Sequence, residues 1–273
     1  MSRRYDALVI GAGHNGLVHA AYLAKAGLRV AVLERNDRVG GATRSEQAVP
    51  GFTYSVFSYL VSLLRPEIVH ELDLVRHGLD IVPLESTLNP LPGGDELYRE
   101  ADPMRTFWNL ARHSRRDAEA YFEYKTEMSA LAHLVLRLQD LVAGDATRSA
   151  VEQTRDGDPE ARGAVLADLA RHYAGVPSSR LDLLYEMMTS SADHFLRRWF
   201  ETDALRAALS TSSIIGSWTS PKTLGSAYVL LHHYIGETDG VYRGWGFQRG
   251  GTGEFAEVLA RAARAAGEEI LLE

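Results

Sequence analysis

Three glycines near the N-terminus have the spacing of a phosphate-binding loop. Gly11, Gly13 and Gly16 form a GxGxxG motif that also contains Ala12 and Asn15. In a strand–loop–helix unit, the first glycine permits a tight turn and the second lets the backbone approach a pyrophosphate. The third lets the helix pack closely on the strand. A lone motif of this kind also occurs as a glycine-rich turn in other α/β proteins, so the interpretation depends on the flanking elements.

The flanking elements have the order that a dinucleotide-binding βαβ unit requires. Residues 7–10 are continuously apolar, which predicts a parallel strand buried on both faces. An alanine- and leucine-rich helix is expected from about residue 14 to 26, closed by Gly27. A second strand over residues 29–33 ends at Glu34, whose carboxylate can accept hydrogen bonds from a ribose 2′-hydroxyl. The unit predicts an adenine dinucleotide site, and by itself leaves NAD and FAD open.

The segment after this acid favours FAD. Glu34 opens an ExxxRxGG pattern that continues through Arg38, Gly40 and Gly41. The glycine pair lets the backbone approach a second part of a long ligand, and Arg38 can neutralise phosphate. The alternative is a loop with a surface arginine and a turn. Glu34 would repel the 2′-phosphate of NADP, whereas the adjacent Arg35 would attract it.

Composition sets limits on the function. The chain has 273 residues, a net charge of −7, 45% hydrophobic residues and no cysteine. It has no strongly basic block, so nucleic acid is not an expected partner. Without cysteine, disulfides, zinc–thiolate sites and CxxC redox pairs are excluded, and no metal site is predicted. Arg3 and Arg4 precede only four apolar residues, too few for an export signal, and no run reaches the roughly 20 apolar residues of a membrane span. We therefore expect a cytoplasmic protein.

The rest of the chain predicts a largely helical region. Residues 79–84 and 96–98 are expected to be strands joined by a turn at 92–95, and helices are expected over about 102–142, 164–174, 180–199 and 203–210. An apolar stripe on the first of these helices predicts domain packing. It consists of Tyr121, Tyr124, Met128, Leu131, Leu134 and Val135. The polar stretch 144–163 predicts a flexible insertion, with a substrate lid as the alternative.

Aromatic residues concentrate between residues 218 and 247, where two side chains are candidates for a substrate pocket. His233 lies in the apolar run YVLLHHYI, and Trp245 follows it. A histidine can transfer protons near neutral pH, but a hydrogen-bonded structural histidine explains the same pattern. The aromatic residues suit either a pocket wall or ordinary core packing. No catalytic residue is assigned.

With these motifs in place, the chain resembles the flavin amine oxidase and phytoene desaturase superfamily, and within it the phytoene dehydrogenase-like group. The resemblance includes the N-terminal motifs, SYLVSLLRP from Ser58 and SPKTLGSAYVLLHHYIG from Ser220. It implies FAD as cofactor and a small, apolar substrate. The implied cofactor-binding residues are Gly11, Ala12, Gly13, Asn15, Gly16, Glu34, Arg35, Arg38, Gly40, Gly41, Ala42 and Thr43.

The fold class implied is α/β, a Rossmann-like FAD/NAD(P)-binding βαβ domain with a largely helical α+β substrate domain inserted. The expected ranges are 1–64 for the FAD-binding region, 65–247 for the substrate region and 248–273 for the return to the first domain. Relatives of this kind are about twice as long, so we expect the C-terminal part of the FAD domain to be missing and the chain to be a fragment. An oligomer, or a missing C-terminal half, would complete it.

The leading functional hypothesis is a FAD-dependent oxidoreductase that moves a hydride between a C–H or C–N substrate and flavin. A second hypothesis is a regulator or binding protein that keeps the fold without turnover. A third is a small NAD-dependent dehydrogenase, which the ExxxRxGG segment and the long helical insertion disfavour.

Overall fold

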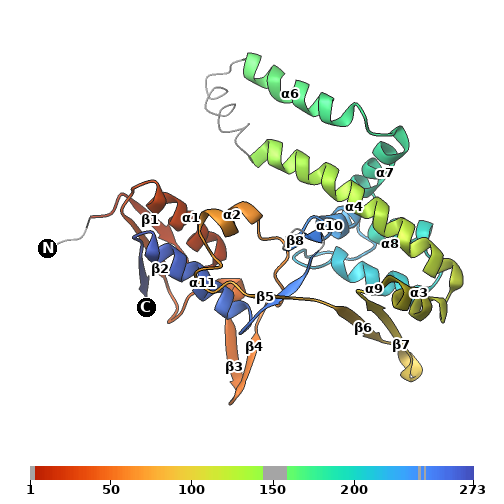
Figure 1. The fold of residues 1–273 in the computed structure, drawn as a ribbon, viewed down its shortest axis with the longest axis horizontal. Helices are drawn as coiled ribbons and strands as arrows, with labels where there is room; N and C mark the ends of the chain where they lie inside the picture. Colours follow the sequence, from red (N-terminus) through yellow and green to blue (C-terminus); the bar gives the residue numbers. More distant parts are fainter. Residues whose placement is uncertain (1–3, 144–158, 239–240, 243) are drawn as a thin grey trace. The chain divides into compact units, whose positions relative to one another are not determined.

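The computed structural model describes residues 4–143, 159–238, 241–242 and 244–273. The chain forms two compact units (Figure 1). Unit 1 comprises Met1–Leu84 and Gly236–Glu273, and unit 2 comprises Glu85–Ile235. These boundaries differ from the expected ranges, because residues 65–84 and 236–247 pack with unit 1. Each unit has a hydrophobic core of its own.

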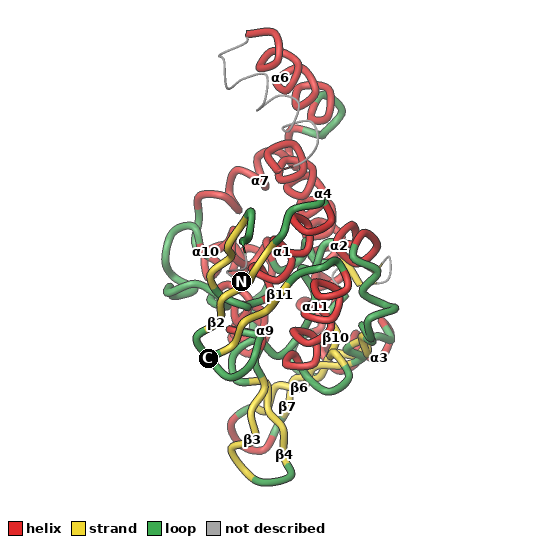
Figure 2. The backbone as a smooth tube through the Cα atoms, turned by 90° about the vertical axis from the view of Figure 1, so that its left-hand side faces the viewer, coloured by secondary structure: helices red, strands yellow, loops and turns green. Residues whose placement is uncertain are grey.

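Unit 1 is built on a three-stranded parallel sheet. Its strands β1 (Ala7–Ile10), β2 (Val30–Glu34) and β11 (Glu269–Leu272) lie in the order β1-β2-β11. Helix α1 (His14–Lys25) connects β1 to β2, and helix α11 (Thr252–Ala265) leads into β11 (Figure 2). Gly27 and Gly267 follow these two helices with φ values of 87° and 99°, the left-handed conformation that ends a helix.

One face of this sheet packs against a core and the other is exposed. Val9, Val32 and Ile270 are cross-strand neighbours that pack in the core of unit 1. On the opposite face, Leu8 is 60% exposed and Ile10 is 88% exposed. The prediction that residues 7–10 are buried on both faces is therefore wrong for the described residues. The apolar run identifies the strand, but burial of its second face depends on what packs there.

Short elements complete unit 1. They are η1 (Gly41–Thr43), the hairpin β3 (Ser45–Val49) and β4 (Phe52–Ser55), α2 (Pro66–Glu71), β5 (Ile81–Pro83), the pair β8 (Glu237–Thr238) and β9 (Val241–Tyr242), and β10 (Gly246–Gln248). Strand β5 pairs antiparallel with β10, far away in the sequence. The expected pairing of residues 79–84 with 96–98 is therefore wrong. Glu96–Glu100 (β7) instead pairs with Ser86–Pro90 (β6) in unit 2, because the Pro92–Gly94 turn joins these closer segments.

Unit 2 is mainly helical, as the sequence predicts. Its helices are α3 (Pro103–Ala111), α4 (Arg115–Ala143), α6 (Pro159–Tyr173), α7 (Ser178–Thr189), α8 (Ala192–Trp199), α9 (Asp203–Ser210) and α10 (Ser226–His232), and the short 3-10 turns η2 (Pro92–Gly94) and η3 (Thr211–Ser213) accompany them. Most of the polar stretch 144–163 lies outside the described residues, and its last five residues open α6. No helix in the described part of the chain is long and apolar enough to cross a membrane.

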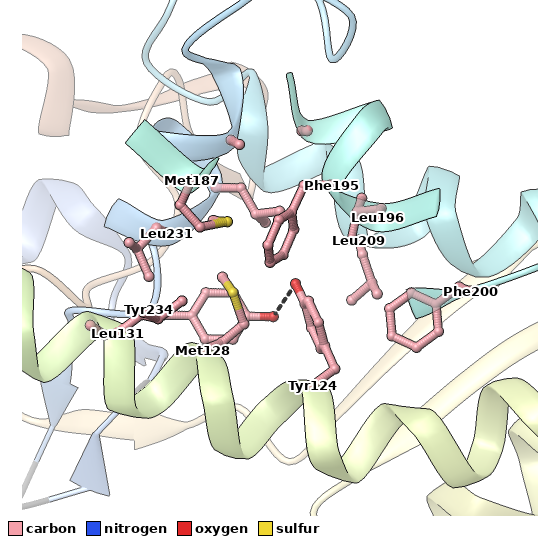
Figure 3. Close-up of a cluster of buried hydrophobic side chains, with 14 of the residues drawn as sticks. Tyr124, Met128, Leu131, Met187, Phe195, Leu196, Phe200, Leu209, Leu231 and Tyr234 are labelled. Atoms are coloured by element: carbon pink, nitrogen blue, oxygen red, sulfur yellow. Dashed lines mark hydrogen bonds between the residues drawn. The ribbon is translucent and has the colours of Figure 1, made fainter. Parts of the chain in front are cut away.

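The apolar stripe of α4 forms the centre of the unit 2 core. Tyr124, Met128 and Leu131 are fully buried, and side chains of α7, α8, α9 and α10 surround them (Figure 3). The Tyr234 hydroxyl donates a hydrogen bond of 3.0 Å to the Tyr124 hydroxyl inside this core. The predicted packing role of the stripe is confirmed.

A buried carboxylate also holds unit 2 together. Asp117 on α4 accepts hydrogen bonds from the backbone N–H groups of Glu201 and Thr202, at 2.8 and 3.0 Å, and from the Thr202 hydroxyl at 2.5 Å. Thr202 is the N-cap residue of α9, and its side chain makes no capping bond to that helix because its hydroxyl donates to Asp117 instead. A carboxylate in this position also interacts favourably with the helix dipole.

We predict that Asp117→Ala destabilises the protein, because it leaves partly buried backbone donors without their acceptor. The expected loss is about 2–4 kcal/mol in the free energy of unfolding, measured by urea denaturation. Glu119→Ala is the matched control on the same helix, since Glu119 forms an exposed ion pair with Arg115. Its expected effect is below about 0.5 kcal/mol. Equal effects of the two variants would contradict this role for Asp117.

A second buried carboxyl, Glu268, has no hydrogen-bond partner among the described residues for either side-chain oxygen. Burial raises its pKa from 4.5 to about 7, and the nearby Arg264 only partly opposes this shift. The folded state therefore binds this proton more tightly than the unfolded state does. Stability linked to Glu268 is present below pH 4.5 and is lost as the pH rises towards 7.

We therefore predict that Glu268→Gln stabilises the protein at pH 8 by up to about 3 kcal/mol and changes little at pH 4.5. Chemical denaturation at both pH values measures the difference. Glu257→Gln on α11 removes the same charge from a less buried position and serves as the control. A wild-type advantage over Glu268→Gln at pH 8 would be incompatible with a raised pKa of Glu268.

Candidate functional site

The GxGxxG loop connects β1 to α1 with the geometry that each glycine was predicted to provide. Gly11 has a φ of 98°, which only glycine adopts readily. A Cβ atom on Gly16 would lie 2.1 Å from the carbonyl oxygen of Gly11, so a side chain there would push the helix off the loop. A Cβ atom on Gly13 would meet only the Gly40 oxygen, at 4.0 Å. The loop is therefore tight at Gly16 and open at Gly13.

The N-terminus of α1 is free to bind an anion. Gly13 is its N-cap residue, makes no side-chain capping bond and is followed by no acidic residue in the first turn. The first helical bond runs from the Leu17 N–H to the Gly13 oxygen, so the N–H groups of His14, Asn15 and Gly16 precede it. Together with the helix dipole, these donors favour a phosphate.

Glu34 lies at the end of β2, as predicted, and is held in place by the loop. Its Oε2 accepts a 2.8 Å hydrogen bond from the Ala12 N–H, and its Oε1 accepts bonds from the backbone N–H and side-chain amide of Asn36. Burial raises the pKa of this carboxyl, but these hydrogen bonds and the nearby Arg35 outweigh it, and the net pKa is lowered. Glu34 is therefore an ionised acceptor, which suits a ribose hydroxyl.

The second glycine pair packs directly on the first motif. The Gly40 N–H donates to the Ala12 oxygen at 2.8 Å, and a Cβ atom on Gly41 would lie 3.3 Å from the Gly13 Cα atom. Both glycines have positive φ values, 126° and 54°. The Thr43 hydroxyl donates to the Gly40 oxygen at 2.7 Å and fixes the turn. The structure thus brings Ala12, Gly13, Gly40, Gly41 and Thr43 together, as the predicted cofactor set requires.

An open cavity of about 630 Å³ lies at the carboxyl ends of the three parallel strands. Ile10, Leu33 and Leu271 are cross-strand neighbours in its lining. Glu34 and Arg35 stand at the same edge, where ligands bind in open parallel sheets. The apolar side chains can pack against an adenine ring, and the ionised Glu34 can accept hydrogen bonds from a ribose, so the cavity suits an adenosine group. Sequence reasoning missed Leu271 and Leu272 here. The signal was available, because residues 248–273 were expected to return to this domain.

Two arginines of this region have different surroundings. Arg38 forms a double hydrogen bond with the neighbouring Asp37, at 3.1 Å for each, and is half exposed. Arg44, which the sequence did not single out, is less exposed, pairs with Glu46, and has a buried Nε without a partner. Both line a second cavity, of about 600 Å³, next to the glycine pair. In this structure the Nε and Nη2 groups of Arg38 therefore interact with Asp37.

The two substrate-pocket candidates belong to different units. His233, in unit 2, is buried, and its Nδ1 lies 2.8 Å from the Val229 oxygen one helical turn earlier, a structural hydrogen bond. Trp245, in unit 1, accepts a 2.7 Å hydrogen bond from the Leu84 N–H at its backbone oxygen. These contacts do not place either His233 or Trp245 in a pocket. The described residues contain no group of His, Asp or Glu side chains suited to hold a metal ion.

The fold is that of a Rossmann-like domain with a second, helical unit, an arrangement shared with the solved flavin-dependent amine oxidases described below. The model of the NAD(P)-binding Rossmann-like domain family matches residues 9–71. Pyridine nucleotide-disulfide oxidoreductase domain-containing protein 2 from Rattus norvegicus is 38% identical over 98% of this chain and 47% of its own length. The chain thus spans about half the length of the curated relatives it matches, and the predicted resemblance is confirmed.

Solved structures agree on the fold. A putrescine oxidase mutant superposes with a TM-score of 0.54 at 20% identity, covering 98% of this chain and 50% of the oxidase. Cyclohexylamine oxidase from Brevibacterium oxydans has a TM-score of 0.53 at 18% identity, covering 99% of this chain and 51% of its own. The predicted α/β fold class is therefore confirmed.

Gly13 and Gly16 give a prediction that separates ligand binding from folding. Gly13→Ala has room within the protein, so we expect near wild-type stability but at least about tenfold weaker ADP binding, because the methyl group occupies the phosphate approach. Gly16→Ala should lower the free energy of unfolding by about 1–3 kcal/mol or more, since the methyl group overlaps the loop backbone. Thermal unfolding and calorimetric titration with ADP measure the two effects. A Gly13→Ala protein that binds ADP normally would argue against a phosphate beside Gly13.

Proposed function

We propose that this chain is the dinucleotide-binding portion of a FAD-dependent oxidoreductase of the phytoene dehydrogenase-like group. The observation that carries the proposal is the contact between the GxGxxG loop and the Gly40–Gly41 turn, closed by the hydrogen bond from the Gly40 N–H to the Ala12 oxygen. A second glycine turn packed on the first suits a ligand that extends beyond one nucleotide. The 38% identity to a pyridine nucleotide-disulfide oxidoreductase domain-containing protein supports redox chemistry.

The residues present fit the adenosine and pyrophosphate end of FAD. Glu34 would accept hydrogen bonds from the ribose, and the apolar side chains of Ile10, Leu33 and Leu271 would contact the adenine. The N–H groups at the start of α1 would bind the pyrophosphate. Gly40 and Gly41 would leave room for the chain of the cofactor that leads to the flavin ring.

When bound, FAD supplies hydride transfer with an apolar small-molecule substrate that contains a C–H or C–N bond. This chain would bind and orient the cofactor. None of its described side chains is assigned a proton-transfer role, and His233 is held by its own helix. A cytoplasmic location is part of the proposal and remains to be measured by fractionation.

The visible spectrum of the purified chain tests the proposal. We expect flavin absorption bands after incubation with FAD, at close to one flavin per chain. Glu34→Gln should weaken FAD binding by about tenfold, because one ionic acceptor for the ribose is lost while the side chain keeps its shape. Glu46→Gln, in the neighbouring cavity, removes the same charge away from the ribose position and serves as the control.

Two other results would replace the proposal. Tight NADH binding without flavin would indicate the NAD-dependent dehydrogenase, which the family model over residues 9–71 does not separate from a flavoprotein. A folded protein that binds neither cofactor would favour a regulator or binding protein that retains the fold without turnover. Fluorescence titration with NADH and circular dichroism distinguish these outcomes.

A further inference from the structure

His14 is the first residue of α1, between Gly13 and the exposed Asn15. The Cα–Cβ bonds of a helix tilt towards its N-terminus, so the Cβ atom of His14 is tilted towards the end of α1 at which the phosphate is proposed to bind. The inference below therefore rests on the proposed function. His14 is not among the residues expected to contact the cofactor, because the GxGxxG motif places no requirement on its side chain.

The two ring nitrogens of His14 differ in their surroundings. Nδ1 is enclosed by the protein and has no hydrogen-bond partner. Nε2 is not enclosed in this way, and no charged side chain of the described residues pairs with the ring. A buried polar atom without a partner is unfavourable. If Nδ1 carried the proton, its N–H group would be a buried donor that has lost its hydrogen bond to water and has no acceptor in exchange. The more favourable tautomer thus leaves Nδ1 without a proton and places the proton on Nε2.

The protonation of the ring agrees with this assignment. Burial lowers the pKa of His14, and no neighbouring charge contributes to the shift. The ring is therefore neutral near pH 7 and carries one proton. A neutral imidazole with a bare, enclosed Nδ1 presents a single N–H donor at its open side, at the end of α1 where the helix dipole favours an anion.

We propose that the Nε2–H group of His14 donates a hydrogen bond to a phosphate oxygen of the bound dinucleotide. His14 then adds a side-chain donor to the backbone N–H groups of the first turn of α1. Hydrogen bonds to a charged acceptor are stronger than neutral ones, so this contact contributes to affinity for the pyrophosphate and to its placement. Adenosine, which has no phosphate, does not use the contact.

Replacement of His14 tests the contact with two probes, ADP and adenosine, in ligand-observed NMR titrations of the whole chain. His14→Phe keeps a ring of similar size and removes the donor, and His14→Leu is a second variant without a donor. His14→Gln keeps an N–H donor. We expect about tenfold weaker ADP binding in the Phe and Leu variants and unchanged adenosine binding. The Gln variant should stay within about threefold of wild type for ADP.

The possible results separate this inference from the proposed function. Wild-type affinity for ADP in the Phe and Leu variants would overturn the role of His14 and leave the proposed function intact. A parallel loss of ADP and adenosine binding would assign His14 a structural role only, and thermal unfolding would reveal the same defect. If the wild-type chain binds neither ADP nor FAD, the proposed function fails, and the role of His14 fails with it.

Discussion

The hydrogen bond from the Ala12 N–H to the Glu34 carboxylate is the interaction on which the candidate site depends. It joins the loop after β1 to the end of β2, 22 positions apart in the sequence. The Ala12 carbonyl on the same residue accepts from Gly40, so one residue connects the glycine loop, the acid and the second glycine turn. Ala12 is fully buried, which keeps water from competing for these bonds. The positions of the three segments proposed to bind the cofactor are thereby linked.

In this arrangement the glycines are required for two different physical reasons, lack of space for a side chain and an unusual backbone conformation. At Gly16 the constraint is space, because the helix and the loop backbone approach each other too closely for a side chain. At Gly11 and Gly40 it is the backbone conformation, since both have φ values that other residues rarely adopt. Gly13 has neither constraint from the protein itself. A glycine that the fold does not require is explained most simply by a ligand that approaches the backbone.

The two units differ in how completely their apolar surfaces are buried. Unit 2 closes its core around α4, with Tyr124 and Tyr234 satisfying each other through one hydrogen bond (Figure 3). Unit 1 packs one face of its sheet, while Leu8 and Ile10 on the other face remain exposed. The carboxyl ends of the same strands line the cavity beside Glu34. Binding of a nucleotide there would cover part of the exposed apolar surface, including Ile10 and Leu33.

The sequence by itself determined the N-terminal βαβ unit and the packing stripe of α4, because the signals of both are local. The GxGxxG motif, the acid at the end of the second strand and the α4 stripe are each set by turn conformation or by helical and strand periodicity. Tertiary structure alone decided the pairing of β5 with β10 and the exposure of Leu8 and Ile10. It also decided which nitrogen of His14 is enclosed. These features depend on which distant segments meet, and no local periodicity specifies such contacts.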